Sequence, residues 1–207
     1  MDPWPITVQA RRSLLSTFEE LDDAQWEAES LCDGWTIRQV LAHLILAARP
    51  PARRYIAAAA RAKGNFDEAN RRLAVTDGAR PTRDLLAGYR AVLDNRFAPP
   101  GWPRAAPLSD ILLHSIDVRL PLGLESHEPA DHYQPVLNLL FSRIGRSFGS
   151  SGRPAVRWVA VDTAWSHGDG PEVRGTMADL ALTAAGRRAR VHHLDGEGAA
   201  TVRDWLG

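Results

Sequence analysis

One segment, LSDILLHSIDVRL, constrains the fold most, because it places polar side chains in the middle of an apolar helix face. At about 100° per residue, Asp110, His114 and Asp117 fall within one arc of about 60°, flanked on both sides by aliphatic side chains. Burying a carboxylate or an imidazole costs several kcal/mol unless a partner satisfies it. Asp110 and His114 would either present two ligands to one divalent metal ion or form a buried ion pair. The opposite side of the helix carries Ser115 and Arg119, and we expect it to face solvent.

His43 is a third candidate ligand, on a second well-specified helix. Thr36 and Gln39 have the spacing of a capping box at the start of the segment TIRQVLAHLILAA, which is otherwise largely aliphatic. Taken alone, His43 fits a hydrogen-bonded core histidine better than a metal ligand. Together with Asp110 and His114 it completes a set of two histidines and one carboxylate. That set suits zinc or ferrous iron, with positions left open for water or substrate.

Two further residues lie close to this set in the predicted helices. Asp117 follows His114 by one turn, where it would either hold a ligand imidazole or pair with an arginine. Cys32 lies just outside the His43 helix, where packing is its expected role and a favoured thiolate is the alternative.

The composition excludes several classes of protein. The 207 residues carry 25 basic and 25 acidic side chains, so the formal net charge is zero and gives no electrostatic footprint for nucleic acid or an anionic membrane. No apolar run is long enough to cross a bilayer, and the first residues lack the order of a signal peptide. Cys32 is the only cysteine, so no intrachain disulfide can form and we expect a cytoplasmic protein.

Hydrophobic periodicity predicts an α+β, mainly α protein with two domains, residues 1–147 and 154–207. The first domain should be a bundle, with helices expected at 7–20, 36–49, 52–62, 66–73, 82–93, 109–120 and 131–147. The segment 148–154, FGSSGRP, marks the boundary. The second should be a small α/β domain, with strands at 156–162 and 172–174, a turn at 167–171, and a helix from Thr176 to a left-handed cap at Gly186.

Three motifs, DGWTIRQVLAHL, DILLHSIDVRLPLG and GPEVRGTMADLALTAAGRR, occur in this order and together resemble the mycothiol-dependent maleylpyruvate isomerase family over nearly the whole chain. The resemblance implies a DinB-like, up-and-down four-helix bundle that holds a divalent metal, usually zinc, at its open end. The family's ligand positions match His43, Asp110 and His114, although the family pattern has glutamate in place of Asp110.

The resemblance also singles out an arginine. The pair Gly186-Arg187 is similar to a Gly-Arg pair that the family places near its metal. Arg187 would then anchor a carboxylate substrate or the thiol cofactor. A solvated cation at a helix end is the alternative for Arg187.

These expectations lead to a metal-dependent enzyme that uses mycothiol, a low-molecular-weight thiol, as an isomerase or S-transferase on a small electrophilic substrate. The metal would lower the pKa of the thiol, and the thiolate would attack an electrophilic carbon. Two alternatives stay open: a metal-dependent hydrolase on the same bundle, and a non-catalytic metal-binding or regulatory module.

Overall fold

The chain divides into two compact units. The computed structural model describes residues 2–126, 128–145 and 152–207. The first unit comprises residues 1–100 and 110–126, and the second comprises residues 101–109 and 127–207. Helix α7 (Ala105–Arg119) contributes its first turn to the second unit and the rest to the first. The predicted domain limits at 147 and 154 remain a prediction, and the boundary segment 148–154 lies largely outside the described residues.

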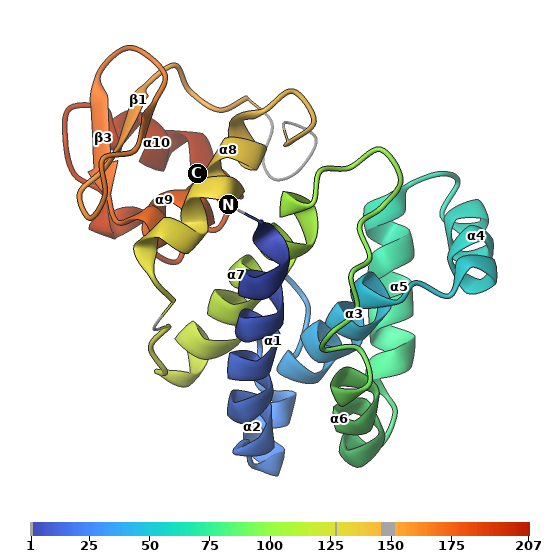
Figure 1. Ribbon diagram of the computed structural model, residues 1–207. Coiled ribbons are helices and arrows are strands. Elements are labelled where there is room, and N and C mark those ends of the chain that lie inside the picture. Colours follow the sequence, from blue (N-terminus) through green and yellow to red (C-terminus); the bar gives the residue numbers. More distant parts are fainter. Residues whose placement is uncertain (1, 127, 146–151) are drawn as a thin grey trace. The chain divides into compact units, whose positions relative to one another are not determined.

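The first unit is a helical bundle, as predicted (Figure 1). Helix α3 lies beside α5 and α6, and α1 packs against α6. The apolar helix faces meet in a core that includes Leu14, Leu41, Leu85 and Leu112, all with no exposed surface. Its helices, besides α7, are α1 (Pro3–Glu19), α2 (Asp23–Glu27), α3 (Ile37–Ala48), α4 (Ala52–Arg61), α5 (Phe66–Gly78), α6 (Thr82–Arg90) and the 3-10 turn Leu120–Leu122.

The N-terminal helix is longer than predicted, beginning at Pro3 instead of residue 7. The Asp2 side chain caps it by accepting a hydrogen bond from the backbone N–H of Trp4 (3.3 Å). Pro3 and Pro5 then stand in the first turn, where the backbone needs no N–H donor, so they favour the helix start. Helix α2 is an addition to the predicted helices, and Asp22 and Gln25 form its capping box.

The expectation that Ser115 and Arg119 face solvent is wrong. Both are buried, with Ser115 fully inaccessible and Arg119 only 5% exposed. The Arg119 guanidinium donates hydrogen bonds to Thr17 Oγ1 (3.1 Å) and Ser13 Oγ (2.9 Å), both on α1. Hydroxyl groups of α1 therefore satisfy the buried guanidinium, and they tie α7 to α1.

The second unit is the predicted small α/β assembly. Its sheet has the order β2-β1-β3; β1 pairs with β2 antiparallel and with β3 parallel, so Trp158 lies between His167 and Val173. Strand β2 occurs where a turn was expected to begin, and α8 is shorter than the predicted helix at 131–147. Besides the first turn of α7, the second unit contains the 3-10 helix Ala130–Tyr133, α8 (Gln134–Phe141), β1 (Arg157–Ala160), β2 (Ser166–His167), β3 (Glu172–Gly175), α9 (Met177–Ala184), the 3-10 helix Val191–His193 and α10 (Ala199–Leu206).

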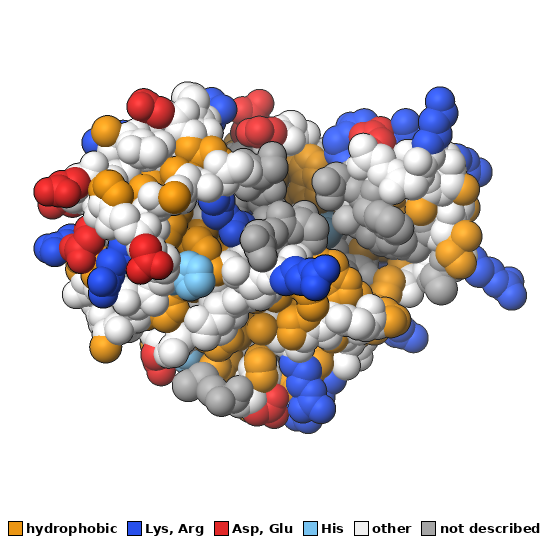
Figure 2. Space-filling model, turned by 90° about the horizontal axis from the view of Figure 1, so that it is seen from above, with side chains coloured by type: hydrophobic (Ala, Val, Ile, Leu, Met, Phe, Trp, Pro, Cys, Tyr) orange, Lys and Arg blue, Asp and Glu red, His pale blue; other side chains and the backbone are white. Residues whose placement is uncertain are grey.

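Every helix in the described part of the chain is too short or too polar to cross a bilayer. On the face drawn in Figure 2, basic, acidic and hydrophobic side chains are interspersed over much of the surface, in keeping with the net charge of zero.

Candidate metal centre

Helix α3 carries His43 in its second turn. The helix starts where the sequence predicts, because Gln39 Oε1 accepts a hydrogen bond from the backbone N–H of Thr36 (3.1 Å). Val40 and Leu41 anchor the helix in the core with no exposed surface. His43 Nε2 lies 3.2 Å from Asp110 Oδ1, while its Nδ1 is buried without a hydrogen-bond partner among the described residues. The ring is therefore fixed with one nitrogen toward Asp110.

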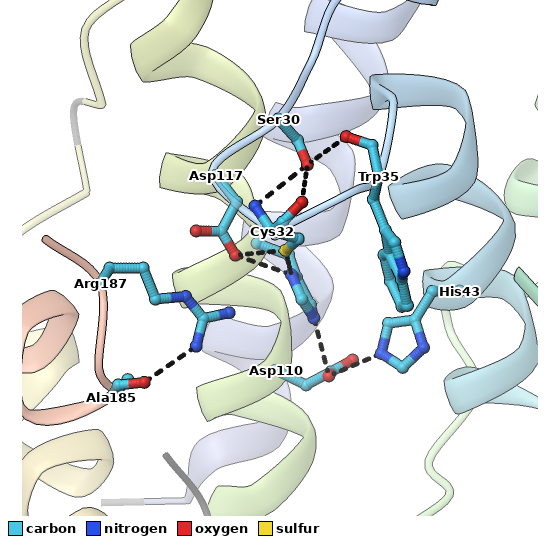
Figure 3. A network of polar contacts seen from close by, with 9 residues as sticks. Ser30, Cys32, Trp35, His43, Asp110, Asp117, Ala185 and Arg187 are labelled. Carbon is cyan, nitrogen blue, oxygen red and sulfur yellow. Dashed lines mark hydrogen bonds and ion pairs between the residues drawn. The ribbon is translucent and has the colours of Figure 1, made fainter. Parts of the chain in front are cut away.

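Helix α7 carries Asp110 and His114 one turn apart. His114 Nε2 lies 3.5 Å from Asp110 Oδ1, so this carboxylate oxygen stands between the two imidazoles. Figure 3 shows Asp110 and His43 pointing toward each other from neighbouring helices. The structure thus brings the three predicted residues together: their candidate ligand atoms all lie within 4.8 Å of one another.

The spacing of these atoms suits a tetrahedral cation. Ligand atoms about 2.0–2.1 Å from a tetrahedral zinc ion stand about 3.3 Å apart. The two distances from Asp110 Oδ1, 3.2 Å to His43 and 3.5 Å to His114, bracket that value. Three side chains with one carboxylate leave a fourth position for water or substrate, which is the pattern of a catalytic site and not of a closed structural one. The donor set therefore fits a divalent metal ion.

The second nitrogen of His114 faces a different pair of groups. Its Nδ1 lies 2.9 Å from Asp117 Oδ2 and 3.4 Å from Cys32 Sγ, and the thiol also donates to Asp117 Oδ2 (3.1 Å). Asp117 has no exposed surface. Of the two roles that the sequence leaves open for Asp117, contact with the histidine is observed. Cys32 was expected to pack, with a favoured thiolate as the alternative, and the sequence carries no signal for its contact with His114.

Charge and burial act in opposite directions on the two α7 residues. Burial alone would raise the pKa of Asp110, but the positive charge of His43 and hydrogen bonds from both histidines hold that pKa well below its ordinary value. Burial alone would lower the pKa of His114, yet its contacts with Cys32, Asp110 and Asp117 hold that pKa well above its ordinary value. Without a metal, the centre therefore holds groups of opposite charge close together. A cation would bind there by displacing a proton.

Trp35 lies beside both histidines. Its ring centroid is 5.2 Å from that of His43 and 6.4 Å from that of His114, stacked on the latter at an interplanar angle of 18°. The indole therefore shields one side of the centre and restricts the two rings to few orientations. The place of Trp35 over the rings depends on how the two helices pack.

Arg187 belongs to the second unit, directly after helix α9. Gly186 has a φ of 90° and ends the helix as the sequence predicts, with Thr176 capping the other end. The Arg187 guanidinium is half-buried and donates to the carbonyl of Ala185 (3.1 Å; Figure 3). Its role as an anchor for substrate or thiol remains a prediction.

Comparison with known proteins agrees with the fold and the motifs. A family model described as mycothiol maleylpyruvate isomerase N-terminal domain matches residues 8–118. Two crystal structures are similar, those of the mycothiol-dependent maleylpyruvate isomerase and of a histidine-to-alanine mutant of it. Each has a TM-score of 0.63 and 14% sequence identity, over 95% of this chain and 93% of the other. No curated protein sequence matches the chain. Because the family model spans more than half of the 207 residues, the chain belongs to the mycothiol maleylpyruvate isomerase N-terminal domain family.

Proposed function

We propose that this protein is a divalent-metal-dependent enzyme that uses mycothiol either to isomerise a small electrophilic substrate or, as an S-transferase, to form a lasting bond between the mycothiol sulfur and a carbon of that substrate. The observation that carries the proposal is the convergence of His43, Asp110 and His114, whose candidate ligand atoms all lie within 4.8 Å of one another, with each histidine 3.2 to 3.5 Å from Asp110 Oδ1. Membership of the family supports mycothiol as the thiol. The metal is zinc, with ferrous iron as the second possibility.

Each of the three side chains would supply a ligand atom to the cation. His43 and His114 each offer Nε2, and the ionised carboxylate of Asp110 supplies negative charge between them. When the Nδ1–H of His114 donates a hydrogen bond to Asp117 Oδ2, the Nε2 lone pair is left free for a metal. A bound divalent cation would lower the pKa of a thiol so that a thiolate exists at neutral pH.

In this proposal, no side chain of the protein acts as the nucleophile. Cys32, the only cysteine, faces the Nδ1 side of His114, opposite to the nitrogen that faces Asp110. An external thiol is therefore required. Arg187 binds a carboxylate of the substrate or of the thiol through its guanidinium. The shorter side chain of Asp110, compared with glutamate in the family pattern, argues for a substrate that differs from maleylpyruvate.

Metal content per chain, measured by plasma mass spectrometry, tests the ligand set. We expect wild type to hold close to one zinc or iron ion, His114→Ala to lose it, and the control His192→Ala, which changes an exposed histidine, to keep it. Absence of metal from wild type after incubation with zinc and ferrous ions would refute the proposal.

Activity assays with and without mycothiol then separate the function classes. Turnover of small electrophiles, maleylpyruvate among them, only when mycothiol is present supports the isomerase or transferase. Turnover without thiol would instead indicate a metal-dependent hydrolase. A protein that binds metal but turns over nothing in either assay would be a non-catalytic module.

A further inference from the structure

The loop between α2 and α3 holds Cys32 against α7 through its own backbone. The N–H of Cys32 donates to Ser30 Oγ (3.1 Å), and that hydroxyl donates to the carbonyl of Trp35 (2.9 Å). The N–H of Leu31 donates to the carbonyl of Asp117 (3.0 Å), which docks the loop on the helix. The position of the thiol is therefore set by the loop and not by packing alone.

Two donors converge on one buried carboxylate oxygen. Asp117 Oδ2 lies 2.9 Å from His114 Nδ1 and 3.1 Å from Cys32 Sγ. A buried carboxylate without donors costs several kcal/mol, so each donor stabilises its charged form and its rotamer. A thiol is a weaker donor than a hydroxyl. Cys32 can therefore fix the carboxylate while the imidazole keeps the stronger hydrogen bond.

We propose that Cys32 is a positioning residue for metal binding. Its S–H holds Asp117 in the rotamer that accepts a hydrogen bond from the Nδ1–H of His114, and this fixes the tautomer and the direction of the Nε2 lone pair. This role uses the thiol in its reduced state and needs no covalent step. The inference rests on the proposed metal site.

A competing arrangement would make the thiol a ligand. Cys32 Sγ, His114 Nδ1 and Asp117 Oδ2 lie within 2.9–3.4 Å of one another, close enough to surround a cation. A neutral imidazole has one lone pair, so His114 cannot serve this position and the Asp110 position together.

The test compares Cys32→Ala, which removes the donor, with Cys32→Ser, which keeps one. Zinc affinity is measured by chelator competition and the ligand field by the visible spectrum of the cobalt-substituted protein. We expect Cys32→Ala to weaken zinc binding about tenfold and Cys32→Ser to remain within about threefold of wild type. Melting of the metal-free proteins separates a general loss of stability from this effect, since a packing role would lower the melting temperature without changing the zinc affinity.

Three outcomes of these measurements would overturn the proposed role of Cys32. Equal zinc affinity in wild type and Cys32→Ala would overturn the inference and leave the metal site standing. A thiolate-to-cobalt charge-transfer band that Cys32→Ala abolishes would overturn it by showing that Cys32 is a ligand. Wild type that binds neither zinc nor cobalt would remove the proposed metal site itself, and with it this role.

Discussion

Replacing Asp117 by asparagine tests most directly whether the carboxylate that contacts His114 sets metal affinity. Asparagine has the same shape, so the buried position stays filled, but it removes the negative charge 2.9 Å from His114 Nδ1. Losing such a partner of a metal-ligating histidine costs about 10- to 100-fold in affinity. That range corresponds to about 1.4 to 2.8 kcal/mol of binding free energy.

The change can be read as a shift in melting temperature. At a zinc concentration about 1,000 times the wild-type Kd, binding stabilises wild type by about 4.1 kcal/mol and the Asp117→Asn variant by about 1.4 to 2.7 kcal/mol. A chain of this length gains about 2 to 4 °C per kcal/mol. Zinc should therefore raise the melting temperature of the variant by about 3 to 11 °C less than it raises that of wild type.

The measurement is the difference in melting temperature with and without zinc, taken within each variant, so a change in metal-free stability cancels. Asp204→Asn is the matched control, because it makes the same substitution at an exposed helical position. Its zinc-induced shift should equal that of wild type. The same shift in Asp117→Asn as in Asp204→Asn would refute the role of Asp117.

Three further predictions follow from the centre and from the second unit. The contacts of His114 hold its pKa above the ordinary value, so the metal-free imidazole stays protonated until the pH passes that pKa. Zinc affinity should therefore fall about tenfold for each pH unit below the pKa of His114 and level off above that pKa. A zinc affinity that does not change with pH in chelator competition would contradict this prediction. Arg187→Ala should raise KM for the thiol or the substrate about tenfold or more with metal content unchanged, and Arg187→Lys should not restore it; steady-state kinetics that detect no change would leave Arg187 a helix-end cation. Gly186→Ala places a side chain at a φ of 90° and should lower the unfolding free energy by about 1 to 2 kcal/mol in urea titration, whereas unchanged stability would show that the turn relaxes.

The helices and the central residues could be predicted because their signals are local. Capping at Thr36 and Gln39 and the spacing of Asp110 and His114 depend only on neighbours in the sequence, and each is observed. His43 could be predicted as the third ligand because it is the one histidine on a second helix that is otherwise largely aliphatic. Short-range periodicity therefore identifies the three residues, and packing supplies their distances.

The features that sequence reasoning missed depend on contacts far along the chain. Arg119 looks like a solvent-facing cation because its partners, Ser13 and Thr17, lie about a hundred positions earlier. Cys32 reaches His114 only because the loop docks on the backbone of Asp117. Neither contact leaves a periodic signal, since each joins residues that no helix or strand relates.

The contact between His43 and Asp110 joins residues 67 positions apart. A cation held by both side chains would join them only in the folded bundle, because closing a loop of this length costs the unfolded chain about 4 kcal/mol in entropy. A chain with a single cysteine cannot close such a loop by an internal disulfide. Its cross-link would instead be reversible and supplied from outside, so the availability of metal would set how much of the protein stays folded.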